Sequence, residues 1–118
     1  MSYVDGFVVA VPKTKVHEYK EFSLRMGAVW KEHGALHYVE CVADDVPYGE
    51  RTSFPRAVQA TEDETVVFAW ITYRSREHRD AVNAKVMADP RRKDLDMSAA
   101  PFDGKRMIFG GFTTLLEL

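Results

Sequence analysis

The chain has 118 residues, 46% hydrophobic and 29% charged, which is the balance of one ordinary globular domain. Its 16 basic and 18 acidic residues give a formal net charge of -2, so no global field attracts it to a polyanion such as nucleic acid. The single cysteine, Cys41, excludes a disulfide within the chain.

The same features bear on location. One cysteine fits a reducing compartment. Strand-like sequence begins at Tyr3, which leaves no room for a signal peptide. No apolar run approaches the roughly 20 residues that a membrane-spanning helix needs. We therefore expect one domain over residues 1–118, in the cytoplasm and without a membrane partner.

The first part of the chain predicts a strand, a helix and a second strand. Tyr3 to Val11 is rich in Val and Phe, as strands are. A helix is expected from about Lys15 to His33, capped by Thr14 and stopped by Gly34. Its apolar positions recur every three or four residues, at Val16, Tyr19, Phe22, Met26, Val29, Trp30 and His33. Leu36 to Ala43 predicts the second strand.

The second part repeats this pattern. Thr65 to Tyr73 predicts the third strand, and Ser53 caps a short helical turn before it. Ser75 caps a helix that reaches about Ala88. Lys105 to Leu118 predicts the last strand. The order βαββαβ is that of an α+β, ferredoxin-like fold, in which both helices lie on one face of a four-stranded antiparallel sheet in the order 4-1-3-2.

The third strand carries information on assembly. From Val66 to Tyr73 it is apolar at almost every position, so it needs cover on both faces. The two helices cover one face of the sheet, and large apolar groups remain on the other. Because such a patch usually marks an interface, we expect a symmetric homodimer in which two sheets face each other.

RNA-recognition motifs share this topology and stack bases on aromatic residues of the third strand. Phe68 to Tyr73 fits the last six places of their signature. Val66 and Val67 replace its basic residue and its Gly, and the acidic stretch 62–64 repels phosphate. An aromatic core strand is the favoured interpretation, and no nucleic-acid partner is expected.

Both ends of the chain carry long motifs. Tyr3 to Pro12 and Pro101 to Phe112 resemble the YbaA-like family, small bacterial proteins that share a domain of unknown function (domain of unknown function 1428). Matches at 34–36, 39–41, 45–47 and 87–91 extend the similarity over the whole chain. The resemblance implies a dimeric α/β barrel, in which two ferredoxin-like sheets close against each other. It implies no reaction, because the superfamily includes monooxygenases, haem-degrading enzymes and pure binding proteins.

Two histidines and the cysteine are the first candidates for chemistry. His33 and His37 flank Gly34, where imidazoles exchange protons near neutral pH or ligate a metal or haem. Their spacing matches no standard metal pattern, and an exposed polar helix end is the favoured interpretation. His37 and Cys41 share one strand face, and if that face meets the helices, both line a pocket there.

Glu40 then points to the opposite face, which we assign to the dimer interface. A carboxylate buried there needs a partner, and Arg106 or Lys105 on the last strand is the expected one. An interface salt bridge is favoured over a general base. Trp70 either shapes an apolar ligand site or fills the core, and the core is favoured.

The segment around Asp103 and Arg106 has the most functional character. Asp103 and Gly104 predict a tight turn. Arg106 is placed to hold a ligand carboxylate or phosphate in a bidentate grip, or to be neutralised by Asp103 in a structural turn. The two interpretations stand level.

The resulting hypothesis is a homodimer that binds a small organic molecule in a pocket between sheet and helices. The candidate ligand-binding residues are His33, His37, Cys41, Trp70, Asp103 and Arg106. Any catalysis would resemble the cofactor-independent monooxygenases or isomerases of the superfamily, with His37 or His33 moving protons. The alternative is a binding or structural dimer without chemistry. Whether the protein is an enzyme stays open, and no cofactor or metal is expected.

Overall fold

In a computed structural model, which describes residues 2–118, four strands form one antiparallel sheet in the order β2-β3-β1-β4. The strands are β1 (Tyr3–Pro12), β2 (His37–Val42), β3 (Glu64–Tyr73) and β4 (Ile108–Thr113). The two most apolar strands, β1 and β3, lie at the centre. The predicted strand order is confirmed.

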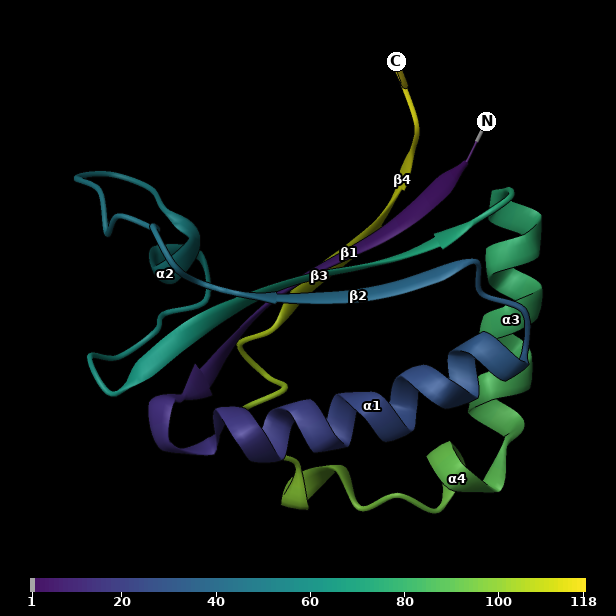
Figure 1. The fold of residues 1–118 in the computed structure, drawn as a ribbon, viewed down its shortest axis with the longest axis horizontal. Helices are drawn as coiled ribbons and strands as arrows, with labels where there is room; N and C mark the ends of the chain where they lie inside the picture. The colour runs from purple at the N-terminus through teal and green to yellow at the C-terminus, as the bar shows by residue number, and fades with distance from the viewer. Residues whose placement is uncertain (1) are drawn as a thin grey trace.

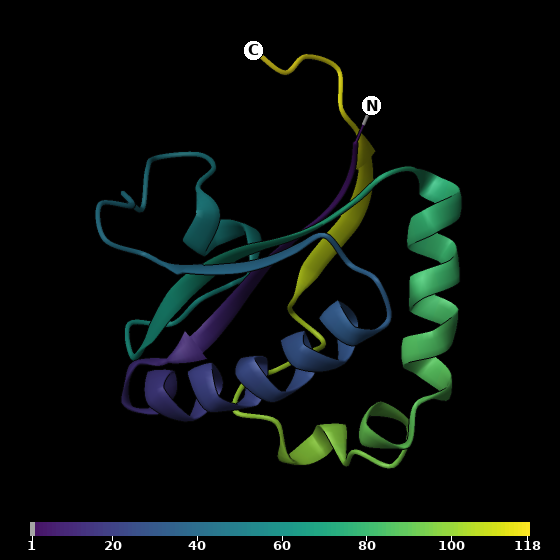
Figure 2. The ribbon, with the colours of Figure 1, turned by 45° about the vertical axis from the view of Figure 1, so that its right-hand side comes forward.

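The two long helices lie on the same side of the sheet (Figures 1 and 2). They are α1 (Val16–Glu32) and α3 (Arg76–Ala88). Two short helices, α2 (Phe54–Ala57) and α4 (Pro90–Lys93), and two 3₁₀ turns, Lys13–Lys15 and Met97–Ala99, lie in the connections. The arrangement is ferredoxin-like and belongs to the α+β class, as predicted.

Three predicted punctuation residues act as expected. The Ser75 hydroxyl accepts a hydrogen bond from the backbone N–H of His78 at 3.1 Å and begins α3. Ser53 does the same for Arg56 at 3.1 Å and begins α2. Gly34 has a φ of +115°, a conformation that a side chain disfavours, and it ends α1.

Two element boundaries differ from the prediction. Thr14 does not cap the first helix, because the chain first makes the 3₁₀ turn and α1 begins at Val16 without a side-chain cap. The last strand is Ile108–Thr113 and not Lys105–Leu118. Its partner β1 supplies no residue beyond Tyr3, which pairs with Thr113, so residues 114–118 have no neighbouring strand.

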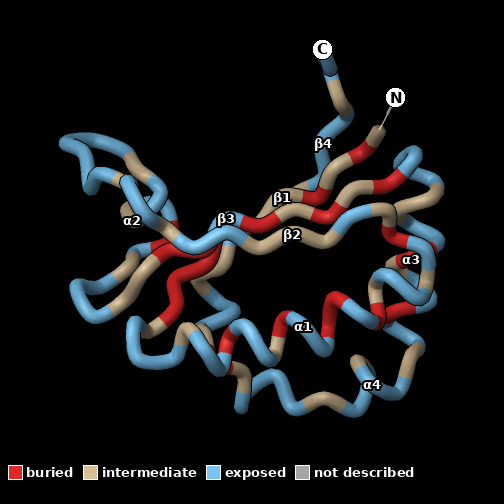
Figure 3. Tube along the Cα trace, viewed as in Figure 1, coloured by how far each residue is buried: buried red, intermediate tan, exposed pale blue. Residues whose placement is uncertain are grey.

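The core lies between the sheet and the helices, where Figure 3 shows buried residues along β1, β3 and the inner sides of α1 and α3. The sheet contributes alternate residues such as Val9, Val11 and Ile71. Val29 of α1 and Val86 of α3 pack against them, at 2% and 0% exposure. This alternation is what one buried sheet face requires.

The opposite sheet face is covered at one end by the chain itself. Val58, which follows α2, is fully buried and packs against Val8, Ala10 and Val66. We call the remaining strand residues of this face the open face. Row by row across β2, β3, β1 and β4 they are His37, Thr72, Val4 and Phe112; Val39, Trp70, Gly6 and Gly110; Cys41, Phe68, Val8 and Ile108.

The open face exposes large apolar side chains. Phe68, Ile108 and Phe112 are 44%, 45% and 63% exposed. The apolar third strand is therefore covered by helices on one face, as predicted, and only partly on the other. The internal cover by the segment 43–63 was not predicted.

Gly27 in α1 sets how closely the helix approaches β2. A Cβ at this position would lie 2.7 Å from the ring of Tyr38. We predict that Gly27→Ala lowers the free energy of unfolding by about 1 kcal/mol, because the ring must move from a packed position. Urea unfolding would measure the change.

Ala28, on the exposed side of the same helix, provides the control. Ala28→Gly should cost about 1 kcal/mol through helix propensity alone. If Gly27→Ala instead gains that amount, the contact with Tyr38 does not constrain the helix.

Candidate functional site

Two hollows lie on the helix side of the sheet and meet at four shared residues, Tyr19, Ser23, Tyr38 and Glu40. The first, of about 330 Å³, runs along the edge strand β2 and the N-terminal half of α1, and we call it the edge cleft. The second, of about 340 Å³, extends under the sheet to α3 and α4, and we call it the central cavity. The shared residues form the junction between them.

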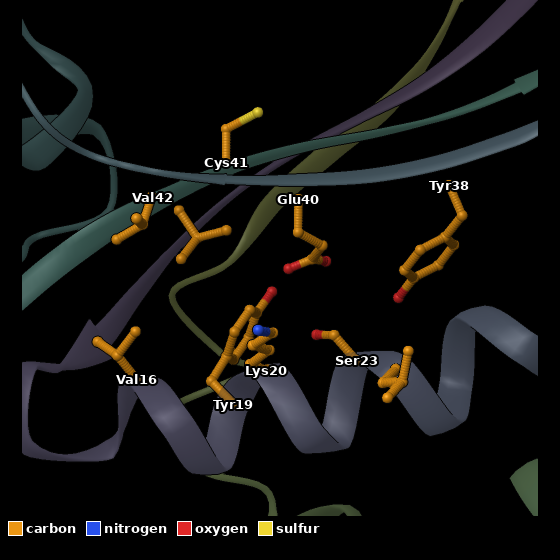
Figure 4. A pocket seen from close by; sticks show the side chains of 10 residues that line it. Val16, Tyr19, Lys20, Ser23, Tyr38, Glu40, Cys41 and Val42 are labelled. Atoms are coloured by element: carbon orange, nitrogen blue, oxygen red, sulfur yellow. The ribbon is translucent and has the colours of Figure 1, made fainter.

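Glu40 lies at this junction. Its carboxyl points from β2 toward α1, where the Tyr19 hydroxyl and the Ser23 side chain face it (Figure 4). The Oε2 atom is buried and has no hydrogen-bond partner among residues 2–118. Buried polar atoms without partners are rare in folded proteins and demand an explanation, and one explanation is a ligand.

Small residues make room for this carboxyl. On the sheet, Glu40 pairs with Ala69 of β3, whose methyl group leaves space above it. On α1, Ser23 and Gly27 follow Tyr19 at four-residue spacing and so lie on one face of the helix. The helix therefore approaches β2 with its smallest side chains.

Burial raises the pKa of Glu40 above its ordinary value of 4.5, and the Tyr19 and Ser23 hydroxyls oppose the rise. Burial also raises the pKa of Tyr19 and of Tyr38, and the negative charge of Glu40 adds to both shifts. Both phenols therefore stay neutral and can donate a hydrogen bond. A carboxyl in this setting exchanges its proton closer to neutral pH than one in water.

The central cavity has mainly apolar walls. Six large side chains that border it are Phe7, Phe22, Met26, Trp30, Phe102 and Phe109. The ring of Phe102 meets those of Tyr19 and Phe22 edge-on, with centroids 5.6 Å apart in each case. These contacts hold the segment 94–107 against α1 and so close one side of the cavity.

Asn83 supplies a polar group on the α3 side. Its Oδ1 accepts hydrogen bonds from Trp30 Nε1 at 3.2 Å and from the Tyr73 hydroxyl at 3.4 Å. Because the indole N–H can only donate, these bonds fix which way the amide faces. The amide nitrogen makes no hydrogen bond within the described residues, and Asn83 borders the cavity. Two N–H donors are thus free for a bound molecule.

A neutralised ion pair lies at the same cavity. Asp5 is 6% exposed, and its Oδ1 accepts a hydrogen bond from Arg79 at 2.9 Å. Arg79 also donates to the Tyr3 hydroxyl at 3.2 Å. Burial raises the pKa of Asp5 despite the attraction of Arg79. The pair brings little net charge to the cavity, which favours uncharged ligands.

Three of the predicted site residues lie on the open face. The Nδ1 of His37 is 2.7 Å from the Thr72 hydroxyl. Cys41 borders the edge cleft, but its sulfur points away from α1 (Figure 4). Trp70 stacks on Phe68 with centroids 5.6 Å apart.

The parity that would have turned His37 and Cys41 toward the helices is therefore wrong. Tyr38 and Glu40 face α1, because they pair with Ile71 and Ala69 on the buried side of β3. The assignment of Glu40 to the dimer face is wrong for the same reason.

His33 lies at the far end of α1, with Nε2 2.8 Å from Asp89 Oδ2, just before α4. Arg106 is engaged elsewhere too. It donates to both carboxylate oxygens of Glu64, at 2.8 and 2.7 Å, and to Asp103 at 3.0 Å. This grip holds the pKa of Glu64 down at about 2 and fastens the segment 94–107 to the start of β3.

The predicted partnership between Arg106 and Glu40 is wrong, since Glu64 occupies the guanidinium. The structure does not gather the six predicted residues into one site. It gathers Glu40, Tyr19, Ser23 and Asn83 instead. A polar Ser23 inside the apolar stripe of α1 was the one sequence signal for this site. Asn83 left none.

Two further searches covered the described residues. Within 2–118, no three His, Cys, Asp or Glu side chains gather as a group that could hold a metal ion. No helix in that range combines the length and the apolar character needed to cross a membrane.

Comparison with known proteins supports the resemblance seen in the sequence. A family model described as a protein of unknown function (DUF1428) matches residues 2–104. The chain belongs to this family. The uncharacterized protein YbaA of Escherichia coli K12 is 55% identical over 117 residues, covering 99% of each chain. YbaA of Shigella flexneri matches equally well. The DUF1428 membership predicted from the two end motifs is confirmed.

Among solved structures, an uncharacterized NIPSNAP domain protein from Burkholderia xenovorans has a similar fold. The TM-score is 0.60, and the alignment covers 95% of this chain and 93% of that one at 15% identity. At this identity the likeness shows the fold alone. The DUF1428 chain thus shares its architecture with a protein that is itself uncharacterized.

The Glu40 carboxyl should oppose folding at higher pH. Because its pKa is raised in the folded state, its contribution to stability is full below pH 4.5 and is lost as pH rises through the folded pKa. Glu40→Gln removes this loss. We predict that the variant is more stable than the wild type by about 1 kcal/mol at pH 8 and gains nothing at pH 4. Chemical unfolding at both values measures this.

Glu64→Gln provides the opposite case, since the pKa of Glu64 is lowered. That variant should be less stable than the wild type at pH 7, with a smaller deficit at pH 3. A Glu40→Gln variant that is less stable at pH 8 would show that the carboxylate is satisfied in the folded state.

Proposed function

We propose that this protein is a homodimer that binds a small, mainly apolar organic molecule in the central cavity of each subunit. The central cavity itself carries the proposal. It joins apolar aromatic walls to an unpartnered carboxyl atom of Glu40 and the free amide N–H groups of Asn83. Apolar walls with a few placed polar groups are the usual composition of small-molecule sites.

Size and charge narrow the class of ligand. A volume of about 340 Å³ is near the lower limit of such sites and fits a molecule of one ring. Arg79 is neutralised by Asp5, and Glu40 repels anions when ionised. Arg92 of α4 borders the cavity as a further cation. A neutral molecule with one or two polar atoms suits these surroundings best.

The open face supports the dimer. The strand residues that compose it include Phe68, Trp70, Ile108 and Phe112 but no Lys or Arg. A surface of this composition suits burial against a second copy of itself. It does not suit RNA, whose backbone requires cationic contacts.

The two tryptophans provide a binding test, because Trp30 borders the central cavity and the ring of Trp70 lies on the open face. In Trp70→Phe, only Trp30 reports. We predict that the neutral aromatic ketone phenylacetone quenches its fluorescence in a saturable manner. In the matched Trp30→Phe variant, quenching should rise linearly, as for collisions in solution. Linear quenching in both variants would contradict the binding proposal and leave a structural dimer as the better description.

Solution mass tests the dimer. Light scattering should give twice the chain mass of 13.5 kDa. Phe112→Asp, on the open face, should shift the protein toward monomers, because it places a charge in the apolar interface. Leu24→Asp is the control, since Leu24 is 67% exposed on α1, away from the open face. A wild-type monomer would contradict the dimer, and a monomer that binds single-stranded RNA would favour an RNA-binding module.

A further inference from the structure

We propose that Glu40 is a catalytic base that moves a proton between two carbon atoms of a neutral carbonyl compound, so that the protein is an isomerase for enolisable ketones or their vinylogues. This inference rests on the proposed binding of a small molecule in the central cavity. It assigns to that site a reaction and a substrate class.

The position of the carboxyl carries the argument. Glu40 borders the central cavity, and its Oε2 is buried without a partner among the described residues. An unpaired carboxylate oxygen beside apolar walls is a stronger base than one in water, because no solvent stabilises its charge. Ala69 beside it keeps the approach open for a substrate carbon.

The other groups at this site cannot play the same part. Asp5 is held by Arg79, and the raised pKa values of Tyr19 and Tyr38 keep both phenols protonated. His33 and His37 lie outside the cavity, bonded to Asp89 and Thr72. Glu40 is thus the group at the cavity best placed to take up a proton and return it.

Donors for the carbonyl oxygen border the same space. The Asn83 amide nitrogen has no partner in residues 2–118, and the hydroxyls of Tyr19 and Tyr38 lie at the junction. One N–H or O–H bonded to the substrate oxygen stabilises the negative charge that develops on it as the C–H bond breaks.

The step needs no further reactant. The Glu40 carboxylate takes the proton from the carbon next to the carbonyl, and the electron pair of that C–H bond moves to form the enolate. The carboxylic acid then returns the proton, to the same carbon or to the γ-carbon of an unsaturated ketone. Return to the γ-carbon moves the double bond, and the enzyme regains its carboxylate.

The rate should increase with pH as Glu40 ionises and then become constant. The charged or titratable groups that face this carboxyl are Tyr19 and Lys20 of α1 and Tyr38 of β2. More distant ones on the same cavity are Asp5, Arg79 and Arg92. The midpoint should lie above 4.5, the ordinary value for a glutamate side chain.

Deuterium exchange into phenylacetone tests the proposal. In D₂O, the wild type should replace the benzylic hydrogens faster than buffer does, in a saturable manner that proton NMR follows. Glu40→Gln should be slower by about 100-fold or more, the usual contribution of a positioned base. His37→Gln, on the open face, should exchange at the wild-type rate.

Binding is measured separately by Trp30 fluorescence in the Trp70→Phe background, with Glu40→Gln added. Quenching without exchange in the wild type would overturn the isomerase proposal and leave the binding proposal intact. Equal exchange by the wild type and Glu40→Gln would overturn the role of Glu40. Absence of both quenching and exchange would overturn both proposals.

Discussion

The register between β2 and β3 is the constraint on which the rest of the site depends. It pairs Glu40 with Ala69 and Tyr38 with Ile71, and so turns a carboxyl and a phenol toward α1. A shift by one residue would instead direct His37, Val39 and Cys41 at the helix. The small residues Ser23 and Gly27 of α1 fit only the observed arrangement, since Gly27 lies under the Tyr38 ring.

This register places a polar group where an apolar one would stabilise the fold better. The buried Oε2 of Glu40 has no partner among residues 2–118, while the two aromatic hydroxyls near it remain neutral. Leaving such an atom unsatisfied costs about 1–3 kcal/mol. Sites that sacrifice stability in this way are commonly those that bind or react. By contrast, Arg106 and Glu64 are fully engaged with each other and fasten the wall of the cavity in place.

The sequence predicted the architecture because its signals are local and strong. The apolar run of β3, the caps Ser53 and Ser75 and the stop at Gly34 each depend on a few neighbouring residues. The site depends on parity in β2, where both alternating sets mix polar and apolar residues. Neither set is the obvious core face, so periodicity could not decide between them. Asn83 and Phe102 reach the cavity from distant segments, and only the tertiary fold brings them together.

The ionisation of Glu40 tests the account most directly. With ¹³C-labelled glutamate, the side-chain carboxyl resonance of Glu40 can be assigned by its loss in Glu40→Gln and followed with pH. The account predicts a midpoint above 4.5 that increases further when phenylacetone fills the central cavity and removes water from it. A midpoint at or below 4.5, unchanged by the ketone, would mean that this carboxyl is solvated and would contradict the central claim.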